Sequence, residues 1–179
     1  MSLRRVSSAF LILLGIALFV ASPASAQDLA VVDVQKIMKD STAAQAARQQ
    51  LQAKQKEFQD QISAKEKDLQ KEDQELAKQR SLMDQDAFKQ KIASFQQKAA
   101  GVQKEVREKR QTFTKAYEDA ISQLHSHVTG IIADMAKEKG FKIAVPTSQI
   151  LYADPALDIS AEVLARLNKQ MPSLTVKFQ

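Results

Sequence analysis

A stretch of about a hundred residues, from Ser41 to Gly140, has helix-type sequence throughout. It is rich in Gln, Lys, Ala and Glu, contains no proline, and has Gly101 and Gly130 as its only internal glycines. At ~1.5 Å per residue, the ~40 residues up to Leu82 span ~60 Å. Because the flanking segments look like parts of one small body, the stretch must run out and back. The sequence therefore predicts a long hairpin of two helices that projects from that body.

The outgoing helix carries apolar residues near a 3.5-residue repeat, which is typical of the seam between two helices. These residues are Ala44, Ala47, Leu51, Phe58, Ile62, Leu69, Leu76 and Met83. Polar residues interrupt the repeat at Gln55, Lys65, Glu72 and Gln79, so the seam is expected to hold the hairpin without packing it tightly. The apolar pattern lapses at residues 81–86, where we expect the far turn.

The returning helix has the cleaner register, with apolar residues that step by four and three and one slip near residue 110. They are Phe88, Ile92, Phe95, Ala99, Val102, Val106, Phe113, Tyr117, Ala120, Leu124, Val128, Ile131 and Met135. With the turn near residue 83, antiparallel pairing places Leu76 by Ile92 and Leu51 by Tyr117. The two repeats then agree, which favours a hairpin over two unrelated helices. Gly140 suits the C-terminal cap of the returning helix.

A small body is expected to form from residues 27–41 and 140–179, on either side of the hairpin arm at 42–139. Short apolar runs predict strands at about 29–34, 142–146 and 149–153, and an amphipathic pattern predicts a helix at about 160–171. Ser160 is expected to cap that helix. The tail at 172–179 fits either a strand or a frayed end.

Self-association would help this body, because about 50 residues give a marginal core and a three-stranded sheet needs a cover. Contact between copies would bury the apolar face and the strand edges. The residues expected at this interface are Val31, Val32, Ile143, Val145, Ile150 and Tyr152.

The N-terminus has the features of a cleavable secretory signal peptide at residues 1–26. Arg4 and Arg5 precede an apolar run at 9–21, and the small-residue pattern at 24–26 predicts cleavage between Ala26 and Gln27. The run is shorter than the ~20 residues that a bilayer core requires. We therefore expect an exported protein that is soluble in the periplasm.

Charge and composition argue against several functions. The formal net charge of +5 is too weak and too mixed in sign to indicate a nucleic-acid partner. The chain has no cysteine and only two histidines, and His125 and His127 point in different directions on a helix, so no metal site is expected. No glycine-rich phosphate loop occurs. We expect no enzymatic activity and no cofactor.

Two groups of residues on the arm are candidates for binding another molecule. Basic residues gather on its outer half: Lys78, Arg80, Lys89, Lys91, Arg107 and Arg110. They form either an ordinary solvated surface or one that attracts acidic clients or anionic lipid head groups. Phe58, Phe95 and Phe113 occupy seam positions, where they either fill the seam or leave apolar surface for a promiscuous binder.

The chain resembles the Skp (OmpH) family of periplasmic chaperones over essentially its whole predicted mature length. The resemblance rests on strand-type segments at Leu29–Val34, Lys142–Val145 and Ile150–Tyr152, on the charged hairpin, and on the ending Leu157–Lys169. In that ending, a D-I-T/S-x-x-V-L signature is matched by Asp158, Ile159, Ser160, Val163 and Leu164. The chain departs from the family beyond Gln170.

The resemblance implies a mainly α fold, with a long antiparallel coiled-coil hairpin projecting from a small, trimeric, β-barrel-like association domain. It also implies a homotrimer that holds unfolded outer-membrane β-barrel proteins between three arms, without ATP. Lipopolysaccharide or another anionic lipid surface is a further possible partner. The rival interpretation is a structural coiled-coil spacer or adaptor of the cell envelope, although the flanks of about 15 and 39 residues are short for an adaptor.

Overall fold

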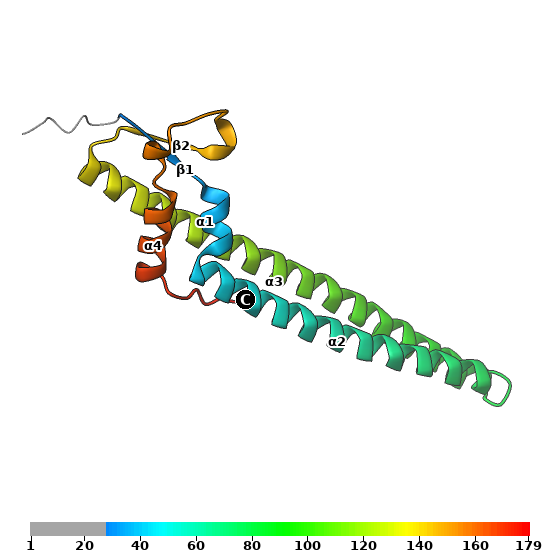
Figure 1. Ribbon diagram of the computed structural model, residues 1–179. Helices are drawn as coiled ribbons and strands as arrows, with labels where there is room; N and C mark the ends of the chain where they lie inside the picture. Colours follow the sequence, from blue (N-terminus) through cyan, green and yellow to red (C-terminus); the bar gives the residue numbers. More distant parts are fainter. Residues whose placement is uncertain (1–27) are drawn as a thin grey trace, which may run out of the picture.

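The computed structural model describes residues 28–179, which form a slender hairpin joined to a small body (Figure 1). The predicted signal peptide at 1–26 and its cleavage site at Ala26–Gln27 lie outside the described residues. In chain order the elements are β1 (Leu29–Val32), α1 (Val34–Asp40), α2 (Thr42–Gln79), α3 (Gln85–Lys139), β2 (Ile143–Pro146) and α4 (Ser160–Gln170). The predicted mainly α fold with an antiparallel hairpin is confirmed.

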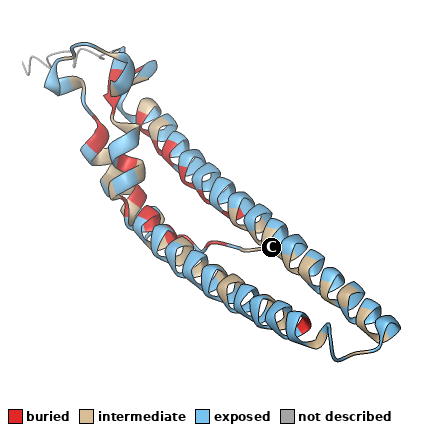
Figure 2. Ribbon diagram, turned by 90° about the vertical axis from the view of Figure 1, so that its right-hand side faces the viewer, coloured by how far each residue is buried: buried red, intermediate tan, exposed pale blue. Residues whose placement is uncertain are grey.

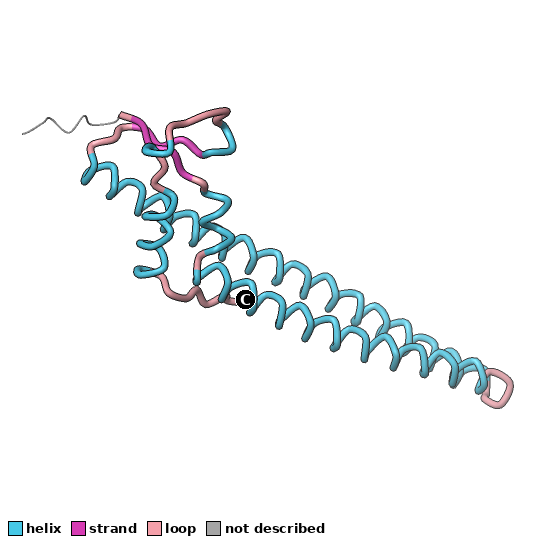
Figure 3. Tube along the Cα trace, viewed as in Figure 1, coloured by secondary structure: helices cyan, strands magenta, loops and turns pink. Residues whose placement is uncertain are grey.

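The hairpin is bounded by local capping contacts at both ends. Ser41 Oγ accepts the Ala44 N–H at 3.2 Å where α2 begins, and Asp84 Oδ1 accepts the Asp86 N–H at 2.9 Å where α3 begins. The connecting turn occupies residues 80–84. Gly140 ends α3 with a φ of 83°, a left-handed conformation that favours glycine. The 55 residues of α3 exceed the 38 of α2, so its C-terminal turns continue into the body (Figure 3).

The body packs the ends of the chain against the last turns of α3. β1 and β2 pair in parallel, from Leu29 opposite Ile143 to Val32 opposite Pro146. The other edge of β1 is taken by the segment before α4, where the Ile159 N–H donates to the Val31 carbonyl at 3.0 Å. The buried core beneath this sheet comprises Ala30, Val32, Ile37, Val128, Ile131, Met135, Phe141, Ile159, Val163 and Leu167.

The prediction of a strand at 149–153 is wrong. Residues 147–149 form a 3₁₀ turn, and residues 150–154 belong to a loop. A short apolar run cannot by itself separate a strand from a loop, and the free edge of β1 is already occupied by residues 158 and 159. The first strand also ends earlier than predicted, because Asp33 caps α1 by accepting the Lys36 N–H at 2.8 Å.

The prediction that Ser160 caps α4 is also wrong. Ser160 is buried, and its hydroxyl oxygen accepts the Asp33 N–H at 2.7 Å, so it is not used to cap α4. Asp158 Oδ1 instead accepts the Ser160 N–H at 2.8 Å. Ser160 therefore ties α4 to the junction between β1 and α1.

Candidate functional site

Polar residues on the two arm helices face one another as a ladder along the seam. Gln61, Lys65, Glu72 and Gln79 of α2 contact Lys109, Glu105, Lys98 and Lys91 of α3, respectively. Toward the far turn, successive contacts step by four, seven and seven residues forward in sequence on α2 and by the same intervals backward on α3. Three of the four positions that interrupt the apolar repeat of α2, Lys65, Glu72 and Gln79, are therefore matched by polar partners on α3, which fixes one register for the hairpin.

Charged groups take part in the contacts of the ladder, so electrostatic attraction contributes to them. Lys98 Nζ lies 2.5 Å from Glu72 Oε2, and Lys109 Nζ lies 2.6 Å from Gln61 Oε1. The hydrogen bond from Lys65 holds the pKa of Glu105 below its ordinary value, and Lys109 adds to this effect. These groups are partly exposed to solvent, so each contact contributes little stability and the ladder aligns the arm rather than tightening it.

The outer part of the arm contains almost no buried residue (Figure 2). Between residues 48 and 115, all of which the structure describes, Leu76 alone is buried. The remaining seam residues are half-buried, because two helices cannot enclose a large side chain on both flanks. The outer two-thirds of the hairpin therefore presents apolar surface without a core of its own.

Two of the three candidate phenylalanines are brought together near the inner end of the arm. Lys54 Nζ lies 5.0 Å from the ring centroid of Phe58, and Lys109 Nζ lies 4.6 Å from it. Phe113 stacks on Phe178 of the C-terminal tail, with ring centroids 6.5 Å apart. Phe95 lies farther out along α3 and is half-buried.

The six basic candidates are all exposed: Lys78, Arg80, Lys89, Lys91, Arg107 and Arg110. Lys78 and Lys89 form ion pairs within their own helices, with Glu75 at 2.8 Å and Asp86 at 3.2 Å. Lys91 Nζ contacts Gln79 Oε1 across the seam at 2.7 Å. Half of the set thus has local partners, as a solvated helix surface would, and a role in binding acidic or anionic molecules stays a prediction.

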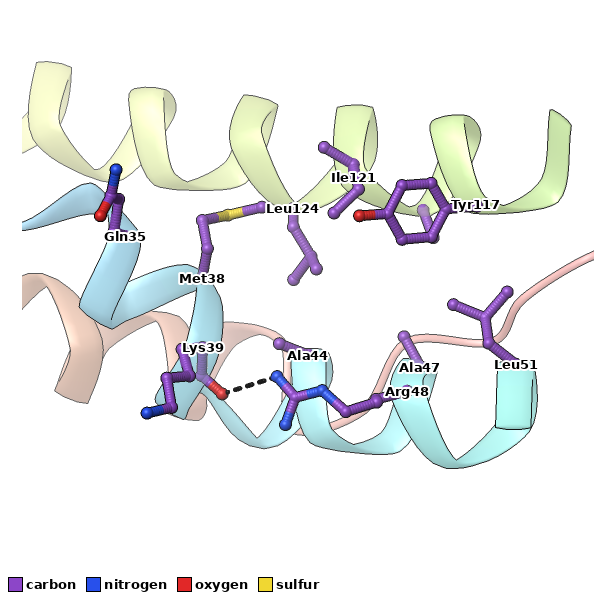
Figure 4. Close-up of a pocket in the computed structure, with 11 residues that line it drawn as sticks. Gln35, Met38, Lys39, Ala44, Ala47, Arg48, Leu51, Tyr117, Ile121 and Leu124 are labelled. Atoms are coloured by element: carbon purple, nitrogen blue, oxygen red, sulfur yellow. Dashed lines mark hydrogen bonds between the residues drawn. The ribbon is translucent and has the colours of Figure 1, made fainter. Parts of the chain in front are cut away.

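An open apolar groove of about 380 Å³ lies where the arm meets the body (Figure 4). Met38 and Leu124 face each other at one end of it, and Leu51 lies across from Tyr117 at the other. The predicted proximity of Leu51 and Tyr117 therefore holds. Ile121 and Tyr117 are exposed in this groove, so it offers apolar surface to a binding partner.

The C-terminal tail covers the other flank of the same seam. Leu174 and Val176 are buried against small residues of both helices, with exposed fractions of 5% and 7%. The carboxamide of Gln50 holds the tail at two points: Nε2 donates to the Leu174 carbonyl at 2.7 Å, and Oε1 accepts the Val176 N–H at 3.0 Å. This contact is not predicted by the sequence, although the alternation of Leu174, Val176 and Phe178 is a strand-type signal.

The predicted interface residues divide into two groups. Val31 and Val32 are 3% and 1% exposed, so they lie inside the subunit and are not available to a partner. Ile143 and Tyr152 are 56% and 84% exposed. Val145 and Ile150 are half-buried. Exposed apolar residues therefore lie on β2 and the loop that follows it, and the role of this surface stays a prediction.

These features define a class of protein: a long helical hairpin with a weakly packed seam, inserted between the two halves of a small α/β body. The family model for "Outer membrane protein (OmpH-like)" matches residues 28–167, and the chain belongs to this family. A search of curated proteins finds no match.

One solved structure shares the fold over most of both chains. It is described as an outer membrane chaperone (OmpH-like) from Caulobacter crescentus, covers 85% of this chain and 90% of its own, and superimposes with a TM-score of 0.79. The sequences are 18% identical, so this likeness establishes the fold alone. The family is not a class of enzymes. Within residues 28–179, no helix is long and apolar enough to cross a membrane.

Proposed function

We propose that this protein is an ATP-independent periplasmic chaperone that holds unfolded outer-membrane β-barrel proteins and prevents their aggregation. Membership of the OmpH-like family supports a chaperone role in general terms. The related solved structure is itself described as an outer membrane chaperone. The holding mechanism is inferred from the chemistry of the arm, and the clients from the resemblance to the family.

The observation that carries this proposal is the near-absence of buried residues in the outer part of the arm. From residue 48 to residue 115, half-buried apolar residues line a seam in which Leu76 alone is buried. Such a surface offers many weak apolar contacts and no single pocket, which suits a protein that binds many sequences and releases them without an energy source. The exposed basic residues on the outer half would speed the encounter with acidic clients.

The working unit in this proposal is a homotrimer. A two-stranded sheet is marginal by itself, and β2 and the loop that follows it carry exposed Ile143, Leu151 and Tyr152. Contact between copies at this surface would cover those side chains and place three arms around one cavity. Ile143, Val145, Ile150 and Tyr152 are the proposed contacts, whereas Val31 and Val32 support them from within the subunit.

Dilution of a urea-unfolded outer-membrane β-barrel protein into buffer tests this function. With the purified chain present, light scattering should stay low, and native mass spectrometry should detect a complex of three chains with one client. A spacer or adaptor of the envelope, the rival interpretation, would leave the client to aggregate. Aggregation at the rate seen without the protein would reject the chaperone role.

A further inference from the structure

We propose that the surface beneath the C-terminal tail is a binding site for a transmembrane β-strand segment of a client. Residues 173–179 occupy this site as an internal substitute. This inference rests on the proposed function and deepens it, because it names the kind of segment bound and the place where it binds.

The first support is how Gln50 holds the tail. Its carboxamide bridges the carbonyl of Leu174 and the N–H of Val176, two residues farther on. A neighbouring strand in a parallel sheet bonds the same two groups, so one side chain imitates a sheet edge. Gln50 Nε2 also donates to the Ala46 carbonyl at 3.2 Å, which anchors the carboxamide. The contact uses only backbone atoms of the tail, so it does not depend on the sequence bound.

The second support is the burial pattern of the tail. Leu174 and Val176 face the helices, and Phe178 is half-buried against Phe113, whereas Thr175 and Lys177 are exposed. This two-residue period is that of an extended strand with one buried face. Most of the buried residues that receive the tail are small and let the backbone approach closely, with Leu124 as the large exception: Ala43, Ala44, Ala47, Ala116 and Ala120.

The third support is the aromatic group at the end of the tail. Lys54 lies between two rings, 5.0 Å from the centroid of Phe58 and 5.8 Å from that of Phe178. Phe178 also stacks on Phe113. The site thus takes two aliphatic side chains in alternation and then an aromatic one. Membrane-spanning β-strands have this chemistry, since apolar and polar residues alternate along them and aromatic residues flank the apolar band.

The tail is covalently tethered to the site that it occupies, so it competes strongly with a free client segment for that site. A segment joined to its site by a short connection has an effective concentration in the millimolar range, so the tail should lower the apparent affinity for a client strand. The contact of the tail with the helices is short and partly exposed to solvent. A client segment that makes a longer contact can therefore displace the tail. Residues 173–179 would therefore keep the site covered until a client arrives.

Removal of residues 173–179 from the otherwise intact mature protein tests the site directly. The probe is a fluorescent peptide with the tail sequence Ser-Leu-Thr-Val-Lys-Phe-Gln, and the readout is its anisotropy. We expect it to bind the truncated protein at least about tenfold more tightly than the full chain. In the truncated protein, Gln50→Ala should weaken binding severalfold, whereas Gln49→Ala, on the exposed side of α2, should not. Equal affinities for the truncated and full proteins would overturn the proposal.

A second measurement uses the full chain, so it does not depend on the stability of the truncated form. The chain has no cysteine, and Gln179→Cys therefore accepts a single environment-sensitive dye. A peptide copied from a transmembrane strand of an outer-membrane barrel should change the dye signal in a saturable way. A peptide of the same composition with the alternation scrambled should have little effect. If the scrambled peptide acts equally well, or neither peptide acts, the proposal is overturned.

The outcomes also separate this inference from the chaperone role. If the full chain suppresses aggregation but the truncated chain binds neither peptide, the tail is only a structural strap and the chaperone role stands. If the truncated chain binds the tail peptide but not the barrel strand, the assigned occupant is wrong. If neither chain suppresses aggregation, the chaperone role itself fails.

Discussion

Arg166 of α4 holds Glu138, near the end of α3, through two N···O contacts of 2.9 and 2.6 Å. The same guanidinium contacts Glu162 at 2.8 Å, and Lys139 donates to the other oxygen of Glu162. This cluster joins the returning helix of the arm to the helix from which the tail departs. It therefore links the position of the tail to the end of the hairpin.

The cluster predicts an acid-sensitive contribution to stability. The Arg166 hydrogen bonds hold the pKa of Glu138 below its ordinary value of 4.5, and Lys139, followed by Arg166, does the same for the pKa of Glu162. Carboxylates with a lowered pKa stabilise the folded state above pH 4.5 and lose that effect as pH falls through the folded-state pKa. Arg166→Gln should therefore lower the melting temperature slightly at pH 7, since the pairs are exposed.

The difference in melting temperature between the wild type and Arg166→Gln should shrink as the pH is lowered below 4.5. Lys169→Gln is the matched control, because it removes one positive charge from an exposed position on the same helix. A difference that stays constant from pH 7 to pH 3 would show that Arg166 acts through packing and not through its carboxylate partners.

A second prediction concerns the glycine at the end of α3. Gly140 has a φ of 83°, so Gly140→Ala places a side chain in a left-handed conformation and should cost about 1–2 kcal/mol of unfolding free energy. Gly130 provides the control, since it lies inside the helix and a Cβ there would meet no atom within 4 Å. Gly130→Ala should stabilise the protein by up to about 1 kcal/mol. Urea denaturation measures both, and a loss of stability in Gly130→Ala would contradict this account.

The hairpin could be predicted from the sequence because its signal extends over about a hundred residues. The proximity of Leu51 and Tyr117 could be predicted because the apolar repeats of the two helices are consistent with the same position of the turn. In the body, the apolar runs are only four to six residues long. Runs of this length do not distinguish a strand from a loop at Ile150–Tyr152. Burial of Val32 inside the subunit also depends on residues of α3 and α4, which share its core from distant parts of the chain. Val31 lies instead beside the loop at residues 147–158, which is equally distant in sequence.

The contact between Gln50 and the tail could not have been predicted either. Residues 50 and 174 are far apart in sequence, and a glutamine among many glutamines on a charged helix carries no distinguishing signal. The alternation of Leu174, Val176 and Phe178 indicated an extended segment but not its partner. Similarly, Lys65 and Glu72 broke the apolar repeat, but their partners on α3 could be identified only in the folded hairpin.

A third prediction tests the buried hydroxyl that joins α4 to the first strand. Ser160→Ala removes the acceptor of the Asp33 N–H and should cost about 1–3 kcal/mol of unfolding free energy, because that donor lies in a partly buried place. Ser173→Ala, at an exposed position, should have little effect. The comparison is made by chemical denaturation. Equal stability of the two variants would show that water replaces the lost acceptor.

The last prediction links the polar ladder to client capture. Lys65 and Glu72 make contacts across the seam, and Arg110 is an exposed residue where the apolar repeat of the returning helix slips. Substitution of all three by leucine adds apolar contact between the helices and should stiffen the arm. Amide hydrogen exchange should slow along residues 60–110, and the capture of an unfolded outer-membrane protein should slow with it.

The matched control for this variant substitutes Lys67, Asp73 and Lys104 by leucine, which makes the same change in charge at exposed positions. The control should leave hydrogen exchange in the arm near the wild-type rate, because its new leucines replace none of the residues of the polar ladder. If the seam variant exchanges more slowly yet suppresses aggregation at the wild-type rate, arm flexibility does not limit capture. If both variants slow capture equally, added surface hydrophobicity is the cause, and the seam has no special role in capture.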